Sequence, residues 1–115
     1  MVIRNIISYK ERFVEFYKSQ DDKVQRKIEY VLDIIRHEQH VPAKFFKSLS
    51  NTNGIHEIRV ITTFKSIRIL CFIDHGNIIV LTNCFLKKTQ ITPKKEIQYA
   101  EKLKEEYLTE KYGGI

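Results

Sequence analysis

Cationic side chains stand where strand-like segments of the sequence run or end. Arg59 and Arg68 each lie in an apolar run, and a third apolar run is followed at once by Lys87 and Lys88. Cations that are held in place around a phosphodiester stabilise the charge that grows in its transition state. Arginine suits this task because its planar guanidinium can hold two phosphate oxygens and stays charged at physiological pH. These four residues indicate chemistry on a phosphodiester, provided that the fold brings them together.

Glu57 stands two residues before Arg59, so the two side chains point to the same face of a strand. One interpretation of Arg68 is a structural ion pair with Glu57, because buried charges usually have a partner. The other is that Arg68, Arg59 and the lysines after the third run converge on one concave surface. The residues alone leave both interpretations open.

Lysines surround the proline turn of "FLKKTQITPKKEI", residues 85–97. A lysine that is partly desolvated among other cations has a lowered pKa and could act as an acid or a base. Lys94 and Lys95 fall in the first turn of an expected helix, where cations are unfavourable beside the helix dipole. That placement suggests a use, although a charge-rich loop is also typical of plain solvated surface.

The totals favour one soluble domain with an anionic partner. The 115 residues suffice for one core, so a single domain over residues 1–115 is expected, and 4 Gly and 2 Pro argue against disordered or fibrous classes. The formal charge of +6 favours a polyanion such as nucleic acid. Neither an apolar run of about 18 residues nor a secretory signal is present, which predicts a cytoplasmic protein without a membrane partner.

No metal or other cofactor is expected. His37 and His40 are three residues apart, but no Cys or carboxylate ligands stand at a matching spacing, which favours a solvated helix end. Cys71 and Cys84 lie in apolar runs, and a chain with this much core needs no disulfide. Both are expected to be buried thiols.

The hydrophobic period predicts a helical hairpin over residues 9–37. Ser8 and Glu11 form the S-x-x-E pattern of a capping box, which predicts a helix from Tyr9 to about Ser19.

Asp21 or Asp22 is expected to cap a second helix, which Pro42 excludes from continuing. The apolar residues that recur at helical spacing in it are Val24, Ile28, Val31, Leu32 and Ile35. The following "AKFFKSLS" is expected to be a connection with room for one more helical turn.

Three strands are predicted next, at residues 55–61, 66–73 and 78–85, because β-branched and aromatic residues dominate these runs. Short turns join them, which makes an antiparallel meander. Residues 2–7 could add a short N-terminal edge strand.

Thr92 and Pro93 then predict the N-cap and first turn of a last helix, which Gly113 closes. The expected fold class is α+β: a small twisted antiparallel sheet with a helical hairpin and a C-terminal helix, its helices covering one face.

The amino-acid sequence of residues 44–108 resembles the RelE/ParE superfamily of bacterial toxins, and within it the HigB-like branch related to phage Gp49 proteins. The resemblance is carried by "EIRV", by an arginine in the following strand, and by "F-x-KKT-x-x-TPKKEI" with a trailing helix. It implies a RelE-like microbial RNase fold and a type II toxin that cleaves mRNA, in relatives on the translating ribosome, without a metal. It also implies an antitoxin partner, usually a helix-turn-helix DNA-binding protein.

The resemblance assigns roles residue by residue. Arg68 matches the strand arginine that contacts the scissile phosphate in ribonuclease members. Lys87 occupies the place after the last strand where those members carry a basic or histidine residue, and Lys88 is adjacent. Glu57 and Arg59 match the Glu-x-Arg pattern of this branch.

The chain departs from many ribonuclease members at its end, where they carry a tyrosine or histidine as acid or base. Here the long "KKTQITPKKEI" helix replaces that ending, and Tyr99 on it cannot be placed over the site. Lys87 and Lys88 are the candidate bases. His56 is a poor candidate because it alternates onto the opposite face of its strand.

The hypothesis is metal-independent RNA cleavage in which the ribose 2′-OH attacks the neighbouring phosphate. Arg68 and Arg59 would hold the phosphate, while Lys87 and Lys88 stabilise charge or move a proton. Four further lysines would bind the RNA backbone: Lys47, Lys65, Lys94 and Lys95.

Two alternatives belong to other classes. One is a ParE-like toxin that inhibits DNA gyrase through protein contacts. The other is a degenerate member that only binds its antitoxin or RNA. The cationic set favours the ribonuclease, because a gyrase inhibitor has no need of aligned Arg and Lys on the sheet.

Overall fold

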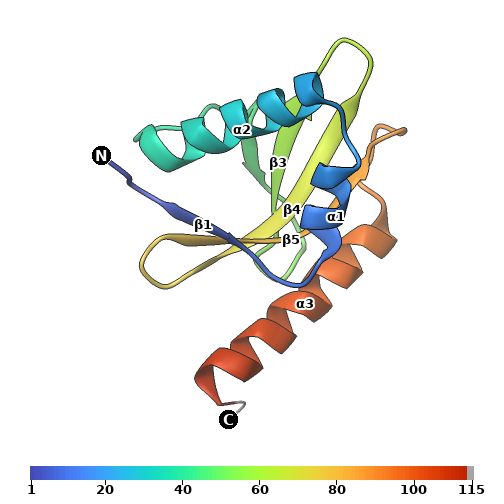
Figure 1. Cartoon of the computed structure of the whole chain (residues 1–115). Helices are drawn as coiled ribbons and strands as arrows, with labels where there is room; N and C mark the ends of the chain where they lie inside the picture. Colours follow the sequence, from blue (N-terminus) through green and yellow to red (C-terminus); the bar gives the residue numbers. More distant parts are fainter. Residues whose placement is uncertain (114–115) are drawn as a thin grey trace.

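A five-stranded sheet forms the centre of the computed structural model, which describes residues 1–113 (Figure 1). The strands are β1 (Asn5–Ser8), β2 (Phe46–Ser48), β3 (His56–Ile61), β4 (Ser66–Asp74) and β5 (Ile78–Leu86). They lie in the order β1-β5-β4-β3-β2. The predicted meander of β3, β4 and β5 is confirmed, and β1 is the expected edge strand. β1 pairs with β5 in parallel, so the sheet is not purely antiparallel.

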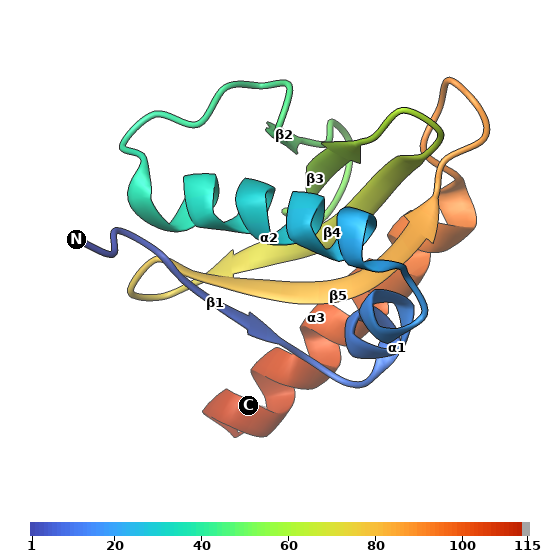
Figure 2. The same cartoon turned by 45° about the horizontal axis from the view of Figure 1, so that its top comes forward.

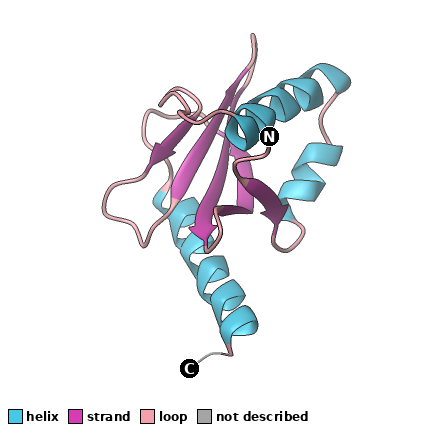
Figure 3. Cartoon of the chain, turned by 90° about the vertical axis from the view of Figure 1, so that its left-hand side faces the viewer, coloured by secondary structure: helices cyan, strands magenta, loops and turns pink. Residues whose placement is uncertain are grey.

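Helices cover both faces of the sheet, so the expectation of one covered face is wrong. α1 (Arg12–Lys18) and α2 (Asp22–His37) pack on one face, and α3 (Lys94–Tyr112) crosses the other (Figure 2 and Figure 3). The reason is that the strand positions turned away from α2 are also apolar. Leu70, Phe72 and Val80 are fully buried there against Ala100 and Tyr107 of α3. A second apolar face needs a second cover.

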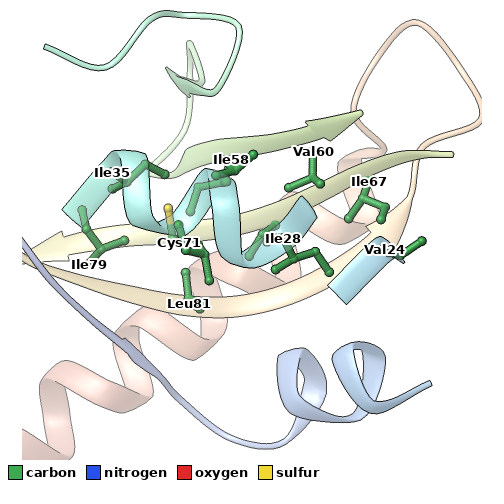
Figure 4. Packing of buried hydrophobic residues seen from close by; sticks show 12 residues of the cluster. Val24, Ile28, Ile35, Ile58, Val60, Ile67, Cys71, Ile79 and Leu81 are labelled. Carbon is green, nitrogen blue, oxygen red and sulfur yellow. The ribbon is translucent and has the colours of Figure 1, made fainter. Parts of the chain in front are cut away.

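The larger core cluster lies between α2 and the sheet (Figure 4). The helical stripe that the sequence predicts is the buried face of α2, namely Val24, Ile28, Val31, Leu32 and Ile35. It packs on Ile58, Cys71 and Ile79 of the three central strands. Of the two candidate caps, Asp21 is the right one, because its carboxylate accepts the backbone N–H of Val24 at 3.0 Å.

The expected start of the first helix at Tyr9 is wrong. β1 continues through Ser8, which pairs with Leu81, so the backbone there is extended and the expected capping box cannot form. Lys10 then turns the chain with a φ of 65°, Glu11 is the N-cap residue, and the helix begins only at Arg12.

The segment "AKFFKSLS" holds a strand where the sequence left room for a helical turn. β2 pairs with β3 in antiparallel register, with Phe46 opposite Ile58. The ring of Phe46 stacks on His56 with centroids 5.1 Å apart. This pairing covers the first half of β3, which would otherwise be an open edge.

Cys71 is buried and Cys84 partly buried, and both are free thiols, as predicted. Burial raises the pKa of each thiol, so neither is a reactive thiolate. Within residues 1–113, no helix is long and apolar enough to cross a membrane.

Replacing Ile28 with alanine should lower the free energy of unfolding by about 2–5 kcal/mol, because the side chain is fully buried and its loss leaves a cavity. Urea denaturation of the purified protein measures this. Ile91→Ala is the matched control, since that side chain is 79% exposed and its loss should change little. Equal destabilisation by both changes would contradict the placement of the core.

Candidate functional site

The strand register brings the predicted cations to one end of the sheet. Arg59 lies directly opposite Arg68, and Arg68 lies opposite Phe85 of β5. Just past β5, the backbone N–H of Lys87 donates to the carbonyl of Ser66 at 2.7 Å. The β3–β4 loop and the loop after β5 project from this same end (Figure 2). Residues from three neighbouring strands therefore meet there.

Glu57 is the fully buried centre of this group. Its Oε1 accepts Arg59 Nε at 3.0 Å and lies 3.3 Å from Arg68 Nε, while its Oε2 accepts the hydroxyl of Thr92. Burial raises the pKa of Glu57, but the hydrogen bonds from Thr92 and Arg59 and the charges of Lys87 and Arg68 outweigh it, so the pKa lies below its usual value. The carboxylate is thus ionised and shared between two guanidinium groups.

Thr92 is a site residue that the sequence assigned to another role. It was expected to cap the last helix, but Pro93 is the N-cap residue and the Thr92 side chain turns inward to Glu57. Asn83 of β5 holds the first turn of α3 nearby, because its Nδ2 donates to Glu96 Oε1 at 2.9 Å. A threonine before a proline looks the same in the sequence whether it caps a helix or donates to a buried carboxylate, so the sequence could not distinguish the two roles.

Arg68 forms the ion pair of the first interpretation and also lies beside Arg59, as the second interpretation requires. It pairs with Glu57 and is only 7% exposed, as a structural ion pair would be. Its Nη1 donates to Ser66 Oγ at 3.0 Å and to the carbonyl of Ile67 at 3.2 Å, which fixes the guanidinium plane. It also lies among the other cations, where the side chain of Arg59 is more accessible, at 27%. Arg68 thus orients the group, and Arg59 presents charge to solvent.

Lys87 is half-buried beside these residues. Burial, together with the charges of Arg68, Arg59 and Lys47, lowers its pKa, and only Glu57 opposes the shift. Lys47 reaches the group because β2 places it directly opposite Glu57. We refer to Lys47, Arg59, Arg68 and Lys87 as the cationic cluster.

The cationic cluster opens into two cavities that share Arg68. One, of about 420 Å³, is lined by Ser66, Arg68, Lys87, Lys88, Thr89 and Gln90. The other, of about 390 Å³, is lined by Lys27, Tyr30, Lys44, Phe45, Arg59, Ile61 and Arg68. Both can receive an anion against at least two cations.

The remaining predicted lysines lie outside the cationic cluster. Lys88 is exposed but lines the same cavity as Lys87. Lys65 donates to Gln20 Oε1 at 2.7 Å and lines a separate cavity beside α2. Lys94 and Lys95 are exposed, and Lys95 lines a cavity between Arg12 of α1 and the first half of α3.

Neither aromatic candidate for proton transfer reaches the cationic cluster. His56 faces the α2 side, as its parity predicts, and burial lowers its pKa, so it is neutral. Tyr99 lies under the guanidinium of Arg12, 4.6 Å from Cζ to the ring centroid. At the end of α2, His37 Nδ1 donates to the backbone carbonyl of Met1 at 3.1 Å. In the described part of the chain, no group of three His, Cys, Asp or Glu is arranged to hold a metal ion.

Comparison with known proteins adds a family and a fold. The family described as Phage derived protein Gp49-like (DUF891) matches residues 15–105. Among solved structures, the chain is similar to one in the crystal structure of the archaeal RelE–RelB complex from Pyrococcus horikoshii OT3. The TM-score is 0.53 with 18% identity, over 73% of this chain and 94% of that one. No curated protein sequence matches the chain. The structural match confirms the predicted RelE-like fold.

Replacing Glu57 with glutamine should lower the free energy of unfolding by about 3 kcal/mol near neutral pH, because it leaves two guanidinium groups without their buried counter-charge. Since the pKa of Glu57 is lowered in the folded state, the stabilisation is present above the unfolded pKa of about 4.5 and is lost as pH falls through the folded value. The difference between wild type and Glu57→Gln should therefore shrink in acid.

Urea denaturation across a pH series measures both effects. Asp33→Asn is the control, because Asp33 pairs with Arg36 on the surface and should change stability by at most about 0.5 kcal/mol. A Glu57→Gln deficit that stays constant down to acid pH would show that the carboxylate charge is not what stabilises the fold.

Proposed function

The chain belongs to the Gp49-like family of phage-derived proteins, and from this premise we propose that it is the toxin of a type II toxin–antitoxin pair that cleaves mRNA without a metal ion. The observation that carries the proposal is the cationic cluster, four cations from four strand regions gathered around one buried carboxylate. The fold shared with a chain of a RelE–RelB complex supports the toxin assignment and a protein antitoxin as partner. Ribosome-bound mRNA is the substrate we infer for it.

The cationic cluster suits a phosphodiester because its charges are fixed before the substrate arrives. Glu57 holds Arg59 and Arg68 in place, so little reorganisation is needed when the phosphate gains charge. Arg59 and Lys87, which are partly exposed and lie beside Glu57 and Arg68, contact the phosphate oxygens. Arg68 acts mainly as a positioning residue, since it is almost fully buried.

The chemistry is attack of a ribose 2′-OH on the adjacent phosphorus. The bond from O2′ to phosphorus forms as the bond from phosphorus to O5′ breaks, which leaves a 2′,3′-cyclic phosphate and a free 5′-OH. Lys87 is the base that accepts the 2′-OH proton, because its lowered pKa increases its neutral fraction. Lys88, in the same cavity, supplies the proton to the leaving O5′.

Replacing Lys87 with alanine should reduce mRNA cleavage about 10²–10⁴-fold, the usual contribution of a general acid or base. Inducible expression in bacteria, with growth curves and mapping of mRNA 5′ ends, measures this. Lys87→Arg should remain defective, because a guanidinium keeps its proton and cannot act as the base. Lys102→Ala is the matched control, as it removes an exposed lysine in a different cavity and should leave cleavage unchanged.

Two results would overturn the proposed activity, and a third would overturn the role of Lys87 as the base. Growth arrest with intact transcripts and accumulating DNA breaks would assign the chain to gyrase inhibition. Absence of toxicity in the wild type would indicate a binding module. Full activity of Lys87→Arg would reduce Lys87 to a source of positive charge.

A further inference from the structure

A line of adjoining cavities runs from the cationic cluster to the tip of the β3–β4 loop. The cavity at Lys87 and the cavity at Arg59 share Arg68. The second of these shares Lys27 and Ile61 with a third cavity, of about 460 Å³, beside the start of α2. Because neighbouring cavities share lining residues, the three adjoin one another, and we treat their combined lining as one surface.

The surface passes around an open part of the sheet edge. β2 pairs with β3 only as far as Ile58, and the last backbone contact between the two segments is from Arg59 N–H to the carbonyl of Phe45 at 2.8 Å. β3 continues beyond this point to Ile61, whose side chain is 54% exposed. The α2 helix runs alongside, so its lysines face the same opening.

Cations line this surface along its length. Beyond the cationic cluster it adds Lys44 and Lys27 in the second cavity, and Lys23 and Lys65 in the third. Asp21 is the one carboxylate among the residues that line the three cavities, and it is engaged as the cap of α2. The charge pattern complements a phosphate backbone.

Aromatic rings alternate with these cations. Tyr30 is 55% exposed and meets Phe45 edge to face, with centroids 6.4 Å apart. Lys27 lies over the Tyr30 ring and Lys44 over the Phe45 ring, at 5.1 and 5.0 Å. Phe64, at the tip of the loop, is 94% exposed. A phenylalanine so fully in water contributes nothing to the core, and nucleobases are flat partners for exposed rings.

We propose that this surface is a binding track for single-stranded RNA, with Tyr30 and Phe64 as stacking platforms for bases and Lys23 and Lys27 as phosphate contacts. The proposal rests on the proposed function in taking the strand to be RNA, and it extends the substrate well beyond the scissile phosphate. The track binds RNA through base stacking and phosphate contacts rather than through hydrogen bonds to base edges, so it accepts many RNA sequences. A protein segment is the competing occupant, but continuity with the cationic cluster favours the nucleic acid.

Fluorescence anisotropy with a short labelled 2′-O-methyl oligouridine tests the track, because this probe has no free 2′-OH and cannot be cleaved. Phe64→Ala and Tyr30→Ala should each weaken binding about 5- to 150-fold, the range measured for single stacked bases. Ile7→Ala, on the opposite edge strand, is the apolar control and should not change affinity. Thermal denaturation of each variant confirms that it is folded.

Salt dependence separates the lysines from the rings. Lys23→Gln and Lys27→Gln should each reduce the slope of log K against log salt by about 0.7, the value for one phosphate contact with a single strand. The aromatic variants should lower affinity and leave that slope unchanged. Lys102→Gln, in the cavities between Arg12 and α3, is the charge control.

The outcomes distinguish failure of the track from failure of the proposed function. Unchanged affinity in both Phe64→Ala and Tyr30→Ala would overturn the track and assign these rings to a protein partner. A wild type that cleaves no RNA but shows the expected ring and lysine effects would keep the track and remove the nuclease. Lys87→Ala should lose cleavage and keep the dependence of binding on Phe64.

Discussion

The site depends on one buried anion. Glu57 lies fully out of water near the start of β3, and such a carboxylate persists only if cations and donors replace the water that it has lost. Arg59, Arg68 and Thr92 supply those partners from three parts of the chain. The same contacts fix the arginines in space and tie the segment before α3 to the sheet. The contacts of Glu57 therefore both stabilise the fold and set the geometry of the site.

In this arrangement the cations differ in their exposure to solvent. Arg68 is nearly enclosed, Arg59 and Lys87 are partly buried, and Lys47 is exposed. Enclosed charges keep their positions but contact a substrate poorly, whereas exposed charges move and are screened. In this site a fixed cation, Arg68, lies beneath more mobile ones. The fixed cation gives the site a defined electrostatic potential, and the mobile ones can adjust to a flexible anion. The opposite end of α3 shows the contrast: Asp74 is satisfied by Tyr107, Lys111 and Tyr112 and offers no free cation.

Features that repeat along a single helix or strand could be predicted from the sequence. Features that depend on contacts between distant segments could not. The stripe of α2 and the three strands follow from hydrophobic period, and strand alternation placed Glu57 and Arg59 on one face. The meeting of Arg59 with Arg68 required the register, since a slip of one residue would have turned one of them away. β2 is too short to leave a periodic signal, and β4 is apolar on both faces, so alternation could not show that α3 covers the second. Lys65, Lys94 and Lys95 stand in loops or at a helix start, where composition does not determine direction.

The parallel pairing of β1 with β5 determines how late the sheet can be completed during synthesis of the chain. β1 is synthesised early, yet within residues 1–113 the strand with which it pairs is β5, the last strand of the sheet to be synthesised. Contacts between such distant segments form late, because the intervening chain must first be ordered. Thr92, which completes the surroundings of Glu57, emerges later still. The group around Glu57 is therefore complete only after the segment that carries Thr92 has been translated.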